Sequence, residues 1–309
     1  MKEGQSGLKR DLKKVPRSPG HRRPFPNRIT RGQLLRGDPL TQGLTGMTGE
    51  DLKRKMERFI HSERHVTSVR IARAFGEDQE GAITCAENLV VAPGLSREAG
   101  EALIALVVEG RIFWSPISRA VYHLDGLFLD LPVSYVQRSH HLPTWLPAAF
   151  NSPLVHKRVM EAIRLMGGVG FDPAISDPDY GSRLYKIQSE LGCERCGRCC
   201  TISSPISLEP QDVERLSARL GIGIRKTIQK YAARVEVDGQ GAWAMKRASP
   251  CIFFDEATGL CKIHPARPIV CRAFPLLSPR TVGGEPWPEW CPAAGCLSKL
   301  AEVPQGRRE

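Results

Sequence analysis

The stretch CERCGRCC places four cysteines within eight residues, from Cys193 to Cys200. A metal site, a redox couple and a disulfide knot are three interpretations of such a stretch. A C-x2-C pair can curl so that both sulfurs reach one ion, and repeating that step delivers three thiolates, as in bacterial ferredoxins. Zinc requires four ligands in a tetrahedron. The adjacent Cys199 and Cys200 are expected to diverge, so at most one of them joins the ion held by the first pair.

Nine of the ten cysteines lie between positions 193 and 296, so the C-terminal third is predicted to be built around thiols. Cys85 is the exception, and we predict that it is a small buried hydrophobe. His264 follows Cys261 by three residues and is either an extra ligand or a surface residue. One centre or two are compatible with nine thiols. The predicted metal ligands are Cys193, Cys196, Cys199, Cys200, Cys251, Cys261 and Cys271, with Cys291, Cys296 and His264 as further candidates.

Basic residues stand beside these cysteines along the chain. Four thiolates around zinc or a [4Fe–4S] core leave a net negative charge, which neighbouring cations would offset while they lower the pKa of the thiols. The predicted compensating cations are Arg195, Arg198, Lys262, Arg267 and Arg272. The sequence alone leaves zinc and an iron–sulfur cluster open as the cofactor.

The cysteines belong to a longer ordered pattern, with ISL at 206–208, CIFF at 251–254, CKIH at 261–264 and RPIVCRAFP at 267–275. Over about residues 188–296, this pattern resembles the CxxCxxCC cysteine-cluster family, also called YkgJ-like. The resemblance implies chelation of zinc or iron. Some members are labelled Fe–S oxidoreductases, and a related branch comprises flagellin lysine methylases. An Fe–S oxidoreductase or a protein-lysine N-methylase is therefore the enzymatic alternative.

The segment upstream of the cysteines has helical periodicity. Arg111–Trp114 and Ala120–Leu124 are predicted as two short strands around a Ser115-Pro116 turn. Helices followed by such a hairpin resemble a winged-helix module, which either packs or binds DNA. Six helices are predicted. The first starts near residue 48, and the second runs through Ile71 and Phe75. The others cover Ser96 to about Glu109, Pro153–Met166, Asp179–Leu191 and the segment from Pro210 to Gly221.

These elements predict a mainly α fold with short β-strands. A helical, winged-helix-like N-terminal domain precedes a loop-rich, metal-stabilised cysteine-cluster domain. The predicted divisions are a disordered basic arm over residues 1–46, the helical domain over 47–130, a proline-containing linker with helices over 131–187, the metal-binding domain over 188–300 and a tail over 301–309.

The net charge of +11 is concentrated at the N-terminus. Residues 1–46 contain eleven Lys or Arg and three acids, whereas the remainder has 33 basic and 30 acidic residues. We interpret this arm as a solvated tail, with a phosphate-directed contact to nucleic acid as the alternative. Combined with a winged-helix-like reader, that contact would suit a DNA-associated metal- or redox-sensing regulator.

A membrane location is not expected. The longest apolar run, around Ala102–Trp114, is interrupted by Glu109 and Arg111 and is shorter than the roughly 20 residues that span a bilayer. The N-terminus lacks the apolar core of a secretory signal. The expected compartment is therefore the cytoplasm, where structural disulfides are rare and clustered cysteines favour metal or redox roles.

Overall fold

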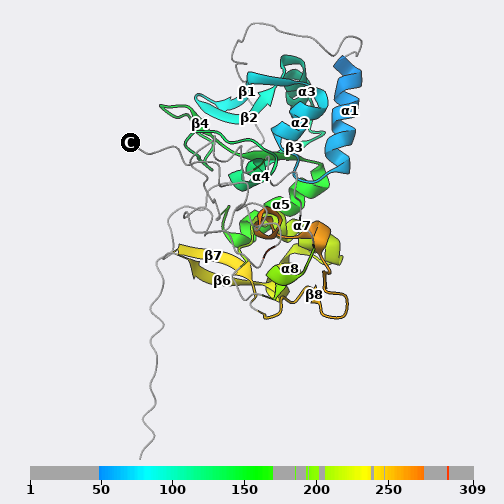
Figure 1. Ribbon diagram of the computed structural model, residues 1–309. Coiled ribbons are helices and arrows are strands. Elements are labelled where there is room, and N and C mark those ends of the chain that lie inside the picture. Colours follow the sequence, from blue (N-terminus) through cyan, green and yellow to red (C-terminus); the bar gives the residue numbers. More distant parts are fainter. Residues whose placement is uncertain are drawn as a thin grey trace, which may run out of the picture.

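The computed structural model describes residues 49–169, 185, 193, 195–201, 206–237, 240–246, 248–274 and 291. Within these ranges the architecture is mixed α/β with several small sheets, whereas the sequence predicted a mainly α fold with short strands. The N-terminal elements form the upper part of Figure 1 and the cysteine-rich elements the lower part. The basic arm, the tail, Cys296 and all of the predicted helix Asp179–Leu191 except Tyr185 lie outside the described residues.

Local capping signals set the helices of the upper part. The Thr67 hydroxyl accepts from the main-chain N–H of Arg70, and the Ser96 hydroxyl accepts from that of Ala99. Such caps satisfy N–H groups that have no partner inside a helix. The three predicted helices are confirmed as α1 (Gly49–Ser62), α2 (Ser68–Phe75) and α3 (Arg97–Val108).

These helices pack beside small sheets that the sequence did not predict. A long antiparallel hairpin joins β1 to β2, and β4 adds to β2 in parallel. A second pair joins β3 to β5, with Phe113 opposite Asn151. The strands are β1 (Glu77–Ala86), β2 (Leu89–Leu95), β3 (Phe113–Pro116), β4 (Thr144–Trp145) and β5 (Ala148–Asn151).

The predicted hairpin within residues 111–124 is wrong. A strand does form at β3, but Ala120–Leu124 belongs to helix α4 (Arg119–Leu124). The Ser118 hydroxyl caps this helix by accepting from the N–H of Ala120 at 3.2 Å. That local cap outweighs the strand preference of the following Val-Tyr pair, so the described residues lack the hairpin on which the winged-helix prediction depended.

The proline-rich segment after α4 is packed rather than exposed along its second half. Trp145, Leu146 and Phe150 are buried, and the Tyr122 ring meets the Trp145 ring edge-on at 4.9 Å. Cys85 is 5% exposed in the same upper part, which confirms its prediction as a buried hydrophobe. No helix among the described residues is long and apolar enough to cross a membrane.

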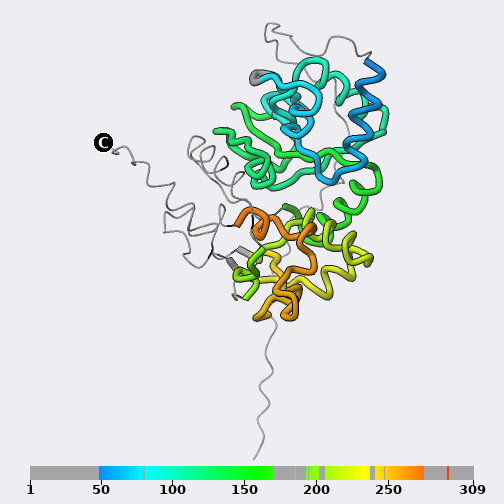
Figure 2. The backbone as a smooth tube through the Cα atoms, turned by 45° about the vertical axis from the view of Figure 1, so that its right-hand side comes forward, coloured from blue at the N-terminus to red at the C-terminus, as the bar shows by residue number. Residues whose placement is uncertain are grey.

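The lower part carries the cysteines around a separate apolar cluster. Ser152 and Pro153 start the first helix, Gly167 (φ 88°) ends it, and Gly221 (φ 65°) ends the second, so both predicted helices are confirmed. Figure 2 traces the chain through the lower part, from green and yellow to the orange segment near the C-terminal end of the described residues. The elements are α5 (Pro153–Met166), α7 (Pro210–Leu220), α8 (Ile224–Tyr231), β6 (Ala232–Val237), β7 (Gln240–Met245), β8 (Phe254–Asp255), β9 (Leu260–Cys261) and α9 (Ile269–Ala273).

The two parts share an interface. Ile269 and Ala273 of α9 belong to the same apolar cluster as Tyr122 and Trp145. The Gln211 side chain of α7 donates to the Pro116 carbonyl at 2.7 Å. The last helix of the cysteine-rich region is therefore buried against the N-terminal elements.

Candidate metal centre

The cysteine-rich turn depends on left-handed backbone conformations. Arg195 (φ 56°) and Gly197 (φ 73°) reverse the chain just before the 3-10 helix η1 (Arg198–Cys200). The N–H of Cys200 donates to the Gly197 carbonyl at 2.9 Å. A Cβ added at Gly197 would lie 2.7 Å from the carbonyl oxygen of Gly259. Glycine is therefore required both for the turn and for its close approach to the β8–β9 hairpin.

Main-chain hydrogen bonds bring two distant cysteines to this turn. The N–H of Cys251 donates to the Cys200 carbonyl at 2.8 Å. The N–H of Phe254 then donates to the Cys251 carbonyl at 2.7 Å, and Phe254 pairs with Cys261 across the hairpin. The hairpin thus places both downstream cysteines beside the CERCGRCC stretch.

The pKa values of three cysteines depend on one another where the turn contacts the hairpin. Interaction with the Cys199 and Cys261 side chains raises the pKa of Cys200. The same interaction with Cys200 lowers the pKa of Cys199 to about 7 and that of Cys261 to about 6. The expectation that at most one of the adjacent Cys199 and Cys200 joins the ion held by Cys193 and Cys196 stays a prediction.

Two more cysteines flank this trio. Burial raises the pKa of Cys251 and of Cys271, and the charge of Cys199 adds to the effect on both. Such mutual influence requires proximity, because unit charges in protein interact appreciably only over short distances. The structure therefore gathers Cys199, Cys200, Cys251, Cys261 and Cys271 into one neighbourhood, which we call the thiol cluster.

Two predicted cations act on this neighbourhood. The Arg267 guanidinium donates to the Cys193 sulfur through Nη1 at 3.5 Å, and the N–H of Arg195 donates to the same sulfur at 3.4 Å. The charges of Arg267 and Arg195 also contribute to the lowered pKa of Cys261. These positive charges stabilise the thiolate form, which is the form that binds metals.

The predicted cation Arg272 has different neighbours. Burial lowers the pKa of its guanidinium, while the charges of Asp212 and Asp125 raise it. Asp212 itself is buried, and burial raises its pKa to about 6. Its carboxylate accepts from the N–H of Glu209 at 3.0 Å and from that of Ile269 at 2.9 Å. Asp212 thereby fixes the start of α9, the helix that carries Cys271.

The remaining candidates are more scattered. Cys196 is exposed and Cys291 is 8% exposed, while Cys296 lies outside the described residues. His264 starts the 3-10 helix η2 (His264–Ala266), and its enclosed Nε2 lacks a hydrogen-bond partner in the described part of the chain. Within that same part, no three His, Cys, Asp or Glu side chains already stand as a metal-binding group. The ligand set stays a prediction.

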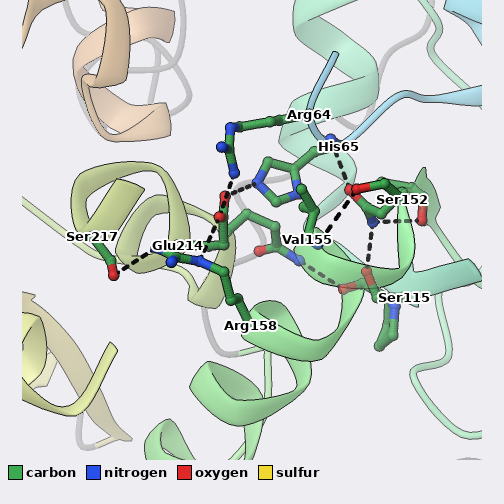
Figure 3. Close-up of polar contacts among 12 residues, drawn as sticks. Arg64, His65, Ser115, Ser152, Val155, Arg158, Glu214 and Ser217 are labelled. Carbon is green, nitrogen blue, oxygen red and sulfur yellow. Dashed lines mark hydrogen bonds and ion pairs between the residues drawn. The ribbon is translucent and has the colours of Figure 1, made fainter. Parts of the chain in front are cut away.

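A buried ionic network, which the sequence did not predict, holds α7 in place (Figure 3). The Glu214 carboxylate is fully buried and accepts from Arg64 Nη1 at 2.5 Å, from His65 Nε2 at 3.2 Å and from Arg158 Nε at 3.1 Å. Burial alone would raise the pKa of Glu214, but these donors outweigh it and the pKa is lowered. Arg158 also donates to the Ser217 hydroxyl at 2.8 Å.

Burial lowers the pKa of His65, so the neutral imidazole donates its Nε2 hydrogen to Glu214. The His65 main-chain N–H donates to the Asn151 side chain at 2.9 Å. The network consequently joins the end of α1, the end of β5, α5 and α7. Because Asp212 lies on the same helix as Glu214, this network also supports the position of α9 behind the thiol cluster.

Comparison with known proteins agrees with the cysteine pattern. Residues 192–292 match the model of the CxxCxxCC family, described as "Putative zinc- or iron-chelating domain". The uncharacterized protein MJ0661 of Methanocaldococcus jannaschii is 28% identical over 83 residues, which are 27% of this chain and 43% of that protein. This chain thus spans less than half the length of that curated relative. No solved structure matches the chain.

Proposed function

We propose that the CxxCxxCC domain at residues 192–292 binds zinc or an iron–sulfur cluster through cysteine thiolates. The observation that supports this proposal most strongly is the main-chain hydrogen bond from Cys251 to Cys200, together with the pairing of Phe254 with Cys261, which bring cysteines from distant parts of the sequence to one turn. Soft thiolate ligands select zinc and iron–sulfur clusters over hard cations. The proposed ligands are drawn from Cys193, Cys196, Cys199, Cys200, Cys251, Cys261 and Cys271.

The surroundings of these thiols suit an anionic metal–thiolate centre. The main-chain N–H groups of Arg195 and Ile263 lie against the sulfurs of Cys193 and Cys261, and the Arg267 guanidinium adds positive charge. Backbone N–H groups and cations of this kind stabilise thiolate sulfur. When bound, zinc supplies folding free energy, whereas an iron–sulfur cluster also supplies one-electron transfer.

A structural role follows from where the cysteines lie. They come from the η1 turn, from the segment that runs from Cys251 through the β8–β9 hairpin, and from α9. Structural zinc contributes about 10–16 kcal/mol of apparent folding free energy in small domains. A centre shared among these three segments would therefore contribute as much as the net stability of a typical domain.

Anaerobic purification followed by metal and sulfide analysis tests this proposal. Iron with acid-labile sulfide and a broad absorption near ~400 nm identifies a cluster. Colourless protein with stoichiometric zinc identifies a zinc site. Freshly prepared protein that holds neither metal, and takes up neither on anaerobic reconstitution, overturns metal binding.

Substitutions assign the ligands. We expect Cys261→Ser and Cys193→Ser to lower bound metal per chain by more than half, because each removes a thiolate from the proposed set. Cys85→Ala is the matched control, since Cys85 is buried in the upper apolar cluster and burial raises its pKa to about 11. Unchanged metal content in both serine variants, or equal loss in the control, would contradict the assignment.

A further inference from the structure

A hollow of about 560 Å³ opens in the cysteine-rich lower part. Its walls come from the end of α7, the end of α8 and the two segments that directly follow Cys251 and Cys261. Ile252 and Lys262 are the residues next to those cysteines, and both line the hollow. A molecule seated there would therefore contact the residues that directly follow two of the cysteines.

The charged residues that line the hollow are all cations, namely Arg219, Lys230 and Lys262. All three are exposed, and no carboxylate of the described residues forms an ion pair with them. The chain on the α7–α8 side of the hollow has the same sign, because residues 215–235 contain six Lys or Arg and no acid, whereas Asp255 and Glu256 lie between the other two wall segments in sequence. Cations that share a concave surface focus a positive potential there and attract anionic partners.

The hollow also has an apolar floor. Ile252 keeps 40% of its surface exposed, although it is a large aliphatic residue, and Leu220 is partly exposed beside it. Exposed apolar surface rimmed by charged residues is typical of protein interaction sites. An occupant that fits both features carries an aliphatic side chain between anionic groups.

The aromatic residues disfavour nucleic acid as that occupant. The Tyr231 ring packs against Phe253 with 5.0 Å between centroids, and the Lys230 ammonium lies 5.2 Å from the Tyr231 centroid. Phe253 is itself buried. Single-stranded nucleic acid is bound by stacking bases on free aromatic faces, and these two rings are already engaged.

We propose that this hollow docks an acidic protein segment through an aliphatic side chain on its floor and carboxylates on its rim. This inference goes beyond metal binding and does not depend on it. The docked partner would contact Ile252 and Lys262, the residues that directly follow Cys251 and Cys261.

Fluorescence anisotropy with synthetic probes tests the docking. The probes are a fluorescein-labelled ten-residue peptide of Asp and Glu around one Leu, the same peptide with Ser in place of Leu, and single-stranded and duplex oligonucleotides of equal charge. Lys230→Glu removes a rim cation, and Ile252→Ser removes the apolar floor. Lys226→Glu is the matched control, because Lys226 is an exposed lysine of the same helix that does not line the hollow.

At low salt we expect Lys230→Glu to weaken binding of the leucine peptide about tenfold relative to Lys226→Glu, because local charge reversal acts on a docked partner. Ile252→Ser should remove the preference for the leucine peptide over the serine peptide. Binding should also weaken as ionic strength rises to ~0.15 M, where the Debye length falls to about 8 Å. Circular dichroism and metal analysis of each variant confirm that fold and metal content are retained, which separates loss of docking from failure of the metal proposal.

Three results would overturn the docking proposal. Equal affinities for the leucine and serine peptides would show that the apolar floor does not contribute to binding. Equal loss in Lys226→Glu and Lys230→Glu would reduce the effect to general attraction. If an oligonucleotide bound more tightly than the leucine peptide, and Lys230→Glu abolished that binding, the hollow would be a nucleic-acid site.

Discussion

Substitution of Glu214 by alanine is expected to destabilise the whole chain. The carboxylate is fully buried and accepts hydrogen bonds from Arg64, His65 and Arg158. Its removal leaves the buried His65 Nε2 and the partly buried Arg158 Nε without their carboxylate acceptor, while Arg158 keeps only its bond to Ser217. Breaking a buried ion pair by removing one partner typically costs about 3–5 kcal/mol, because the remaining charge stays desolvated.

Urea denaturation followed by circular dichroism measures this loss. For a chain with 150–250 ordered residues, each kcal/mol lowers the melting temperature by about 2–4 °C. We therefore expect Glu214→Ala to melt roughly 6–20 °C below the wild type. Glu214→Gln keeps the shape and one acceptor oxygen, so it should lose about half as much. Because the folded-state pKa of Glu214 is lowered, its contribution is present above the unfolded pKa of about 4.3 and disappears as the pH falls through the folded value.

Glu101→Ala is the control, since Glu101 pairs with Arg97 at 3.0 Å on the exposed face of α3. An exposed pair at this helical spacing contributes at most about 0.5 kcal/mol. If Glu214→Ala cost less than about 1 kcal/mol, or no more than Glu101→Ala, the network would not hold the two parts together as argued. A difference between wild type and Glu214→Ala that grew under acid would contradict the sign of the pKa shift.

Three further predictions test the turn, the helix start and a buried imidazole. Gly197→Ala should lower the bound metal per chain and destabilise the protein clearly more than Gly221→Ala. Both glycines have a left-handed backbone, but only at Gly197 would the new Cβ meet another chain segment. Metal analysis and urea melts of the two variants test this. Asp212→Ala should cost about 2–4 kcal/mol in urea, because two buried N–H groups lose their acceptor, and an equal cost in Asp212→Asn would contradict that reason. Burial lowers the pKa of His123 to about 3, so the folded state keeps this imidazole neutral while the unfolded state takes up a proton below about pH 6.5. The wild type therefore loses stability as the pH falls. The free energy of unfolding of His123→Leu should rise relative to that of the wild type by up to about 1.4 kcal/mol per pH unit between about pH 6.5 and 5. A constant difference in parallel urea melts would count against this.

The sequence predicted those elements whose signals are local. Thr67, Ser96 and Ser152 cap helices that start where expected, and Gly167 and Gly221 end helices where expected. A strand was predicted near β3, but the pairing of the strands escaped prediction because it depends on remote partners: β5 pairs with β3 across a long connection, and β4 adds to β2 in parallel. Helix α4 was mistaken for a strand because its Val-Tyr pair hid the cap at Ser118.

The candidate site also has features that the sequence predicted and features that it did not. The thiol types and spacings predicted that Cys251 and Cys261 would join the CERCGRCC stretch, and the hairpin places them there. Glu214 left no sequence signal, since its donors lie 150, 149 and 56 residues away along the chain.

Helix α9 joins the cysteine-rich region to the upper part. Cys271 lies on this helix, while Ile269 and Ala273 from the same five residues are buried against Tyr122 and Trp145 of the upper part. Asp212 fixes the helix start from α7, which the Glu214 network ties to the upper part in turn. Any free energy gained by binding a metal at Cys271 therefore also favours the packed arrangement of the upper part, because the same rigid helix serves both contacts.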